Sequence, residues 1–232
     1  MLKSRLLTTL KLNRENKMKN TVKIIIILIV LVVLINILLF STKLTGRSIA
    51  EQETIKIGLV GMLSGDYSIW GQSGLSGVEL AVDEFNNKGG INNKKIELII
   101  EDDKGISTDA VNAFNKLINI NNVDAILSVS ASGATASAVP IAQKNKVPVV
   151  IGTASAPHIT LTRNYIFRTM PSDSAQGKYA AEFIYNNLNK KKIALLYVKN
   201  DWGEGLYQVF EQRYKELGGE IVYKNSICKK KQ

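Results

Sequence analysis

The sequence predicts an α/β fold built around a doubly wound parallel sheet, and two observations carry this prediction. Short apolar runs, such as residues 55–60 and 123–129, alternate with longer stretches whose apolar residues recur at helical spacing. This alternation is typical of βαβ units, in which consecutive strands lie parallel and helices cover the sheet. The runs also mix few polar residues among the apolar ones, as expected of strands covered on both faces.

Local signals justify each element of the first half. Gly89 and Gly90 end a predicted helix, because glycine adopts a left-handed φ without a steric penalty. Ser107 is expected to cap the helix that follows it. The predicted elements are strand 55–60, helix 74–87, strand 95–101, helix 107–119, strand 123–129, helix 134–144 and strand 147–151.

The same pattern continues in the second half. Asp173, shortly after Pro171, is expected to cap a long helix, whereas Asp201 is interpreted as a turn former. The predicted elements are strand 165–169, helix 173–189, strand 192–198, helix 205–217 and a last strand that begins at 220–223.

Composition narrows the classes of function. The 232 residues include one cysteine, Cys228, and one histidine, His158, which excludes an intrachain disulfide framework and Cys/His zinc motifs. The net charge of +10 comes from the two ends: residues 1–23 carry seven basic residues against one glutamate, and residues 224–232 carry four lysines. A nucleic-acid-binding protein is expected to spread its basic residues over the folded surface. We therefore expect no nucleic-acid partner and no metal site.

Residues 24–40 form an apolar run with a single polar member, Asn36. As a helix this run spans about 25 Å, near the lower limit for crossing a membrane. The basic residues 1–23 before it predict a cytoplasmic N-terminus and a folded body outside the cell membrane. We favour a transmembrane signal anchor over a signal peptide cut after Ala50, which would release a secreted or periplasmic protein. Met18 is an alternative start of the chain.

The binding site is expected in three loops that follow predicted strands. These loops, residues 64–71, 130–135 and 152–157, are rich in Ser, Thr, Gly and Ala. In doubly wound sheets, ligands bind at the carboxyl edge, near the point where the strand order reverses. A helix that begins near Ala134 points its N-terminus at the same edge, which suits a carboxylate. From spacing alone, ligand binding and simple helix capping by these hydroxyl groups stay equally open.

The glycines after the first strand invite a different interpretation, that of a dinucleotide-binding enzyme. They are spaced Gly58-x-x-Gly61-x-x-x-Gly65, and acidic residues 101–103 stand where such folds bind ribose. The spacing matches neither the G-x-G-x-x-G fingerprint nor a Walker motif, so we expect no cofactor. No two residues are positioned by sequence as a general acid and base, so we also expect no catalysis.

Several stretches occur together in a specific order and spacing. They are Ile57–Gly65 with Trp70-Gly71, Ala81–Asn86 with Gly89–Ile91, Ile99–Asp103, Ser132-Gly133, Pro140–Ala142, Val147–Val149, Phe167–Thr169 with Pro171–Asp173, Gln176-Gly177 and Trp202–Gly205. In these stretches the chain resembles the extracytoplasmic solute-binding proteins of branched-chain amino-acid ABC transporters, the leucine-binding-protein type with a type I periplasmic-binding fold. The resemblance implies a first ligand-binding lobe at 55–171 and an incomplete second lobe at 172–223. Residues 41–54 are polar and are interpreted as a linker, and the polar lysine tail at 224–232 does not resemble the family.

The resemblance also implies ligand-binding roles for five residues. Ser132, with nearby backbone N–H groups, receives the ligand's α-carboxylate. Thr153, through its carbonyl, and Ser155, through its hydroxyl, receive the α-ammonium group. Trp70 forms a wall of the side-chain pocket, and Trp202 is the aromatic residue of the second lobe, where the family commonly has tyrosine.

The function that the resemblance implies is the binding of a small amino-acid-like solute as the substrate-binding component of an ABC transporter. Its partners are then a permease in the membrane and, through residues 24–40, the membrane itself. Family members are longer than this chain, so we expect a truncated form that lacks the acidic residue completing the ammonium site. A ligand-sensing ectodomain of a membrane receptor and an anchored dinucleotide-binding enzyme are the alternatives.

Overall fold

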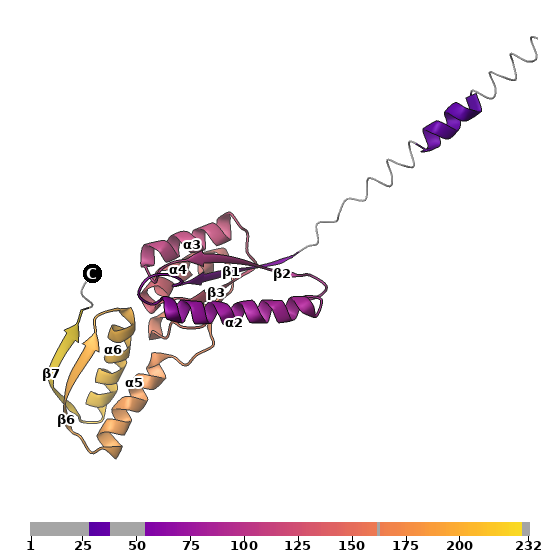
Figure 1. The fold of residues 1–232 in the computed structure, drawn as a ribbon. Helices are drawn as coiled ribbons and strands as arrows, with labels where there is room; N and C mark the ends of the chain where they lie inside the picture. Colours follow the sequence, from indigo (N-terminus) through magenta and orange to yellow (C-terminus); the bar gives the residue numbers. More distant parts are fainter. Residues whose placement is uncertain (1–27, 38–53, 162, 229–232) are drawn as a thin grey trace, which may run out of the picture. The chain divides into compact units, whose positions relative to one another are not determined.

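A computed structural model describes residues 28–37, 54–161 and 163–228 (Figure 1). The chain divides into two compact units, residues 1–52 and 53–232, and each is described by itself. In the first unit, residues 28–37 form a helix in which the Asn36 side chain donates a hydrogen bond to the Val32 carbonyl at 2.7 Å. The remainder of the predicted transmembrane segment, 24–40, lies outside the described residues. Among the helices that the structure describes, none combines the length and the apolar character needed to span a membrane.

The described part of the second unit confirms the predicted parallel sheet. Its strands follow the order β2-β1-β3-β4-β5, and every neighbouring pair is parallel. This order reverses direction between β1 and β3, so the loops after these strands diverge at that point of the edge. The strands of this sheet are β1 (Ile55–Gly61), β2 (Ile96–Asp102), β3 (Ala125–Val129), β4 (Val149–Ile151) and β5 (Ile166–Arg168).

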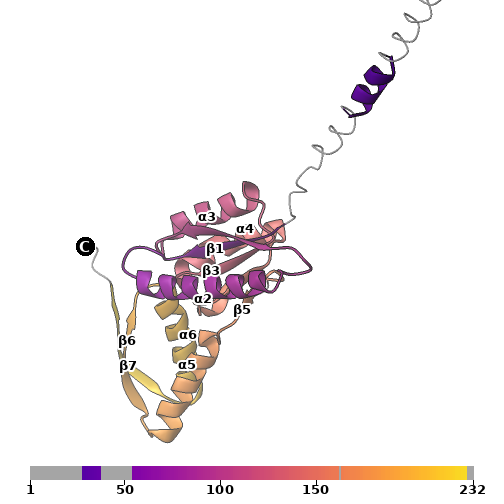
Figure 2. The same ribbon diagram turned by 45° about the vertical axis from the view of Figure 1, so that its right-hand side comes forward.

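Helices cover both faces of this sheet (Figures 1 and 2). On one face, α3 (Ser107–Asn119) and α4 (Ser132–Asn145) pack side by side and form the main core with the strands. On the opposite face lies α2 (Ser68–Asn87). Leu59, Val60 and Ile126 are fully buried between these layers, which explains why the strands are apolar throughout rather than alternating.

The start of α2 corrects the sequence analysis, which placed it at Gly74. The helix begins six residues earlier, at Ser68. A Cβ on Gly71 would lie 2.2 Å from the Met62 carbonyl oxygen, and one on Gly74 would lie 2.8 Å from a methyl group of Val129. These glycines let the helix approach the sheet closely. They therefore serve packing within the helix, which extends toward the N-terminus beyond both of them.

The segment after Pro171 builds a smaller α/β layer. In it, β6 (Lys192–Val198) pairs in parallel with β7 (Glu220–Ile227). A second core, formed by Ala181, Phe210 and Tyr214, lies between this sheet and its helices. The helical elements are α5 (Asp173–Glu182), the π-helical turn η2 (Phe183–Asn187) and α6 (Asp201–Glu216). The predicted helix 173–189 is therefore interrupted after Glu182, and strand β7 continues through the first residues of the predicted lysine tail.

The helices predicted to begin at 107 and 173 do begin there, but the capping residues differ from those predicted, and the helix predicted to begin at 205 starts at Asp201. Ser107 is the first residue of α3 and makes no side-chain cap, because Ile106 holds the cap position. The hydroxyl of Ser172, and not the carboxyl group of Asp173, accepts the capping hydrogen bond of α5, from the Ser174 N–H. Asp201 is no turn former but begins α6, which Asn200 caps by accepting from the Gly203 N–H at 2.8 Å.

Within residues 54–161 and 163–228, no segment covers one face of the two-stranded sheet. Leu196, Val222, Tyr223 and Ile227 are each more than half exposed there, whereas Leu195 on the same strand as Leu196 packs into the second core. An exposed apolar sheet face with free strand edges favours association with other chains.

Candidate functional site

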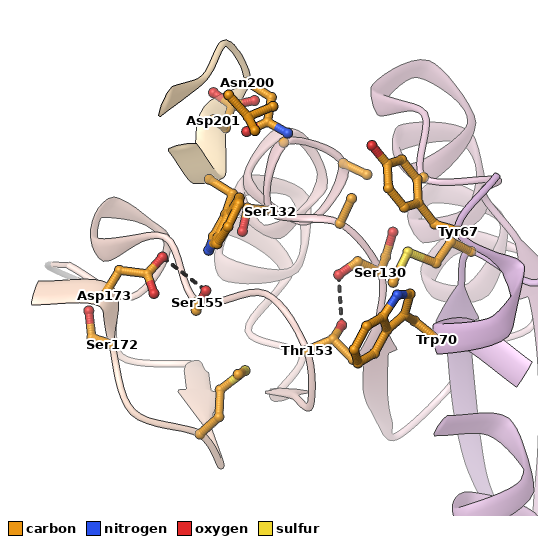
Figure 3. Close-up of a pocket in the computed structure, with 18 of the residues that line it drawn as sticks. Tyr67, Trp70, Ser130, Ser132, Thr153, Ser155, Ser172, Asp173, Asn200 and Asp201 are labelled. Atoms are coloured by element: carbon orange, nitrogen blue, oxygen red, sulfur yellow. Dashed lines mark hydrogen bonds between the residues drawn. The ribbon is translucent and has the colours of Figure 1, made fainter. Parts of the chain in front are cut away.

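A cavity of about 1120 Å³ opens at the carboxyl edge of the five-stranded sheet (Figure 3). The loops after β1, β2, β3 and β4 contribute to it, and so do α5 and the start of α6 from the second layer. The cavity therefore lies at the edge where parallel α/β sheets bind ligands. The five residues singled out from the sequence all line it: Trp70, Ser132, Thr153, Ser155 and Trp202.

The N-terminus of α4 forms one part of the cavity wall. The helix starts at Ser132, two residues before the predicted start, so Ser132, Gly133 and Ala134 all line the cavity. The first N–H groups of a helix have no acceptor within the helix and carry the positive end of its dipole. The Ser132 hydroxyl accepts from the Ala156 N–H at 3.4 Å, which leaves its own proton available as a donor.

Asp201 approaches this helix end from the second layer. A Cβ on Gly133 would lie 2.2 Å from the Asp201 Oδ2 atom, so a residue with a side chain would displace the carboxylate. Asp201 and Asp173 are the charged residues among the described residues that line the cavity, and this lining contains no lysine, arginine or histidine.

The loop after β4 contributes two hydroxyl groups that are already engaged. Thr153 donates its hydroxyl proton to the Ser130 carbonyl at 2.7 Å, and Ser155 donates to the Asp173 Oδ2 atom at 2.9 Å. Because these bonds fix both side chains, the loop presents a rigid polar surface to the cavity (Figure 3).

Asp173 is the residue that the sequence analysis missed. It was interpreted as a helix cap, but Ser172 performs that role, and the Asp173 carboxyl group is instead turned into the cavity wall beside Ser155. Burial raises the pKa of Asp173, and the hydrogen bond from Ser155 and the positive charge of Arg168 act in the opposite direction. The presence of serine directly before Asp173 was the signal that the cap position was already filled.

Aromatic side chains line the other parts of the cavity. Figure 3 places Tyr67 and Trp70, from the α2 side, across the cavity from Ser155 and Asp173. Trp70 is 64% exposed and Trp202 is 41% exposed, so neither residue is buried in the hydrophobic core. Such half-free aromatic rings can enclose an apolar group of a ligand.

The glycines and acids that suggested a dinucleotide site have structural roles. A Cβ on Gly58 would lie 2.7 Å from a Leu117 methyl group, so this glycine serves packing against α3. The Asp102 carboxylate accepts from the Leu63 N–H at 2.9 Å and from the Ser64 hydroxyl at 2.5 Å, which holds the loop after β1. Asp103 is buried and accepts from the Gly105 N–H at 2.9 Å.

A family model described as periplasmic binding protein matches residues 54–227. The Leu/Ile/Val-binding protein of Escherichia coli (strain K12) is 31% identical over 182 residues, which are 78% of this chain and 49% of that protein. The branched-chain amino acid transporter substrate-binding protein LivJ from Streptococcus pneumoniae, solved in complex with isoleucine, has a TM-score of 0.68 at 34% identity. That match covers 76% of this chain and 50% of LivJ.

A solute-binding protein of an ABC transporter from Rhodopseudomonas palustris, solved with 3,4-dihydroxybenzoic acid, has a TM-score of 0.68 at 26% identity. The match covers 75% of this chain and 47% of that one. The chain thus spans about half the length of the curated relatives it matches. Because the family model covers most of the chain, the resemblance inferred from the sequence is confirmed, and the chain belongs to the periplasmic binding protein family.

Proposed function

We propose that the chain binds a small amino-acid-like solute outside the cytoplasm, as the substrate-binding component of an ABC transporter. One observation carries the proposal: a single cavity joins a helix N-terminus, a hydroxyl–carboxylate pair and exposed tryptophans. These features complement the carboxylate, the ammonium group and the apolar side chain of an amino acid, respectively. The names of the relatives, which include Leu/Ile/Val-binding proteins, support the same ligand class.

In this proposal the ligand's carboxylate lies at the start of α4. The Ser132 hydroxyl and the N–H groups of Gly133 and Ala134 donate hydrogen bonds to it. Neutral donors and a helix dipole bind a carboxylate without a fixed counter-charge, which is compatible with the absence of basic residues from the described cavity lining.

The ammonium group lies beside the loop after β4. The Thr153 carbonyl, the Ser155 hydroxyl oxygen and the Asp173 carboxylate form an acceptor group there. A charged acceptor strengthens each hydrogen bond to an ammonium group roughly twofold over a neutral one. Asp173 thus supplies a negative charge at this position, and it favours an amino acid over an aromatic acid that lacks the ammonium group.

The ligand's side chain then extends toward Trp70. This ring, with Met62 and Tyr67, forms the apolar end of the cavity on the α2 side, and Trp202 covers the ligand from the second layer. Burial of a leucine-sized side chain contributes about 1.5–3 kcal/mol to binding.

The place of the protein in the cell is part of the proposal. Residues 24–40 anchor the chain in the membrane, the body from residue 55 onward faces outward, and a permease receives the ligand. Selective labelling of Cys228 in intact cells with a membrane-impermeant maleimide tests the orientation, because the reagent reaches this exposed thiol only from outside.

Isothermal calorimetry of the full chain in mild detergent tests the ligand class. Titration with leucine, isoleucine and valine is expected to give saturable heat, whereas 3,4-dihydroxybenzoate is expected to give none. Saturable heat for the aromatic acid alone, or for none of these compounds, would contradict the proposal.

A further inference from the structure

We propose that Arg168 is a positioning residue of the binding site: it fixes the loop that carries Ser155 and maintains the negative charge of Asp173 without touching the ligand. This inference rests on the proposed function, because it explains how the ammonium-binding group is held in place. Arg168 ends β5, where it pairs with Ile151 of β4, and it does not line the cavity.

The guanidinium group of Arg168 forms hydrogen bonds to two successive backbone carbonyl groups of the loop after β4. It donates one hydrogen bond to the Ser155 carbonyl and another, of 3.0 Å, to the Ala156 carbonyl. A third bond of 3.1 Å runs to the Thr160 hydroxyl group. The planar fork of an arginine fixes both carbonyl groups at once, which a lysine ammonium group does not reproduce.

Asp173 ties the same loop from the other side. Its backbone N–H donates to the Ser155 carbonyl at 3.0 Å, and its carboxylate accepts from the Ser155 hydroxyl at 2.9 Å. Arg168 and Asp173 therefore both form hydrogen bonds to Ser155, in the loop after β4. A change in Arg168 is transmitted to the cavity through Ser155 rather than by direct contact.

The charge of Arg168 also acts on the protonation of Asp173. Burial raises the pKa of Asp173, while the Ser155 hydrogen bond and the Arg168 charge favour the ionised form. The loop after β4 supplies no charged side chain to the cavity lining. Helix α6 supplies only Asp201, and a negative charge does not favour ionisation of the Asp173 carboxyl group. Arg168 is thus the cation that sustains the Asp173 carboxylate among the described residues around it.

An uncharged Asp173 would lose most of its attraction for an ammonium group. Loss of the Arg168 charge is therefore expected to weaken leucine binding most strongly at acidic pH, where the Asp173 carboxyl group becomes protonated. A purely mechanical role would weaken binding equally at every pH. The two roles are separated by comparing Arg168→Met, which removes the charge, with Arg168→Lys, which keeps the charge but loses the fork.

The test combines two readouts on the full chain in mild detergent. The first is a ¹³C-carboxyl NMR titration of Asp173, assigned with the Asp173→Asn variant, which requires no ligand. We expect a higher titration midpoint for Arg168→Met than for the wild type, and a nearly unchanged midpoint for Arg168→Lys. Arg168→Gln is the second neutral variant and decides the point if Arg168→Met does not fold, as judged by circular dichroism.

The second readout is calorimetry with leucine at about pH 5 and pH 8. For each variant we compare its leucine affinity with that of the wild type at the same pH. For Arg168→Met and Arg168→Gln, we expect the fold loss of affinity to be about ten times larger at pH 5 than at pH 8. For Arg168→Lys, we expect the same fold loss at both pH values. Wild-type protein that binds no leucine at either pH would contradict the proposed function, while the NMR midpoint would still decide the role of Arg168. A folded neutral variant with the wild-type midpoint of Asp173 would overturn the inference.

Discussion

The Ser155 hydroxyl donates a 2.9 Å hydrogen bond to the Asp173 carboxylate, and both residues line the cavity although they are 18 positions apart in the chain. Ser155 belongs to the loop after β4, whereas Asp173 is the first residue of α5. The bond therefore joins the five-stranded sheet to the first helix of the second layer at the place where we propose that the ammonium group binds.

Replacement of Asp173 by asparagine tests this pair. Asp173→Asn keeps an acceptor for the Ser155 hydroxyl but removes the charge, so leucine affinity is expected to fall about 10- to 100-fold, as for loss of one charged hydrogen bond. Calorimetry measures the loss. Asp109→Asn, at a carboxylate on α3 that pairs with Lys104 and does not line the cavity, is the control. An affinity loss of equal size in both variants would speak against a specific role for Asp173.

Asp201 is expected to oppose binding of the ligand's carboxylate. Its carboxyl group lies against Gly133 at the start of α4, where the ligand's carboxylate is proposed to bind. Asp201→Asn is therefore expected to raise leucine affinity by about two- to fivefold, the size of a screened contact between like charges. The control is Glu204→Gln, which removes a negative charge from the same first turn of α6 but lies outside the cavity lining. It changes the interaction with the helix dipole as Asp201→Asn does, and it is expected to leave leucine affinity unchanged. A weaker complex in Asp201→Asn would contradict the proposed position of the carboxylate.

Trp70 is expected to contribute to binding and little to folding. Its side chain is 64% exposed, so Trp70→Ala is expected to change the free energy of unfolding by less than about 0.5 kcal/mol. Leucine binding is expected to weaken about tenfold, and alanine binding much less, because only the larger side chain reaches the ring. The control is Leu80→Ala, an equally exposed position on α2 that does not line the cavity. Equal losses for leucine and alanine would argue against a wall at Trp70.

Two glycines in α2 form a matched pair for the packing of this helix. A Cβ at Gly71 would lie 2.2 Å from the Met62 carbonyl oxygen, whereas a Cβ at Gly77 would meet no atom within 4 Å. Gly71→Ala is expected to lower the free energy of unfolding by about 1–3 kcal/mol, through the forced shift of the helix. Gly77→Ala is expected to raise it by about 0.5–1 kcal/mol, because alanine is the better helix former. Urea unfolding measures both, and destabilisation by Gly77→Ala would show that the helix packs differently.

Asp103 is expected to make stability depend on pH. The residue is fully buried, and burial raises the pKa of its carboxyl group, although the hydrogen bond from the Gly105 N–H partly opposes this. The pKa of Asp103 is therefore higher in the folded state than in the unfolded state, so the protonated carboxyl group contributes to the free energy of unfolding. This contribution is complete below the unfolded-state pKa and is lost as the pH rises through the folded-state pKa.

Asp103→Asn is therefore expected to lose less stability than the wild type between about pH 4 and pH 7. Asparagine keeps an acceptor for the Gly105 N–H and carries no charge that must be buried. Urea unfolding at the two pH values gives the comparison, with Asp83→Asn on the exposed side of α2 as the control. The same pH dependence in wild type and Asp103→Asn would refute the role of this carboxyl group.

The sequence predicts the strands and the convergence of the candidate residues on one cavity, for a physical reason. Strands covered on both faces are continuous apolar runs, and the carboxyl ends of parallel strands meet at one edge. The small polar residues after β3 and β4 therefore had to lie near one another, and Ser132, Thr153 and Ser155 do line one cavity.

The features that the sequence analysis missed depend on contacts between distant residues. The sequence analysis places Gly71 in a loop and begins the helix at Gly74, and only the close approach of these glycines to the Met62 carbonyl and the Val129 side chain explains why both lie within the helix. The hydrogen bond between the Asp173 carboxylate and Ser155, 18 positions earlier, likewise has no local sequence pattern. The role proposed for Arg168 could not be predicted from local sequence, because two of its partners are backbone carbonyl groups that any sequence supplies.

The most direct measurement compares leucine with 4-methylpentanoate, which has the same side chain and carboxylate but no ammonium group, in calorimetric titrations of wild type and Asp173→Asn. We expect the wild type to prefer leucine by at least about tenfold and Asp173→Asn to lose most of that preference. Wild-type protein that binds both compounds equally, or a preference that survives in Asp173→Asn, would contradict an ammonium site at Ser155 and Asp173.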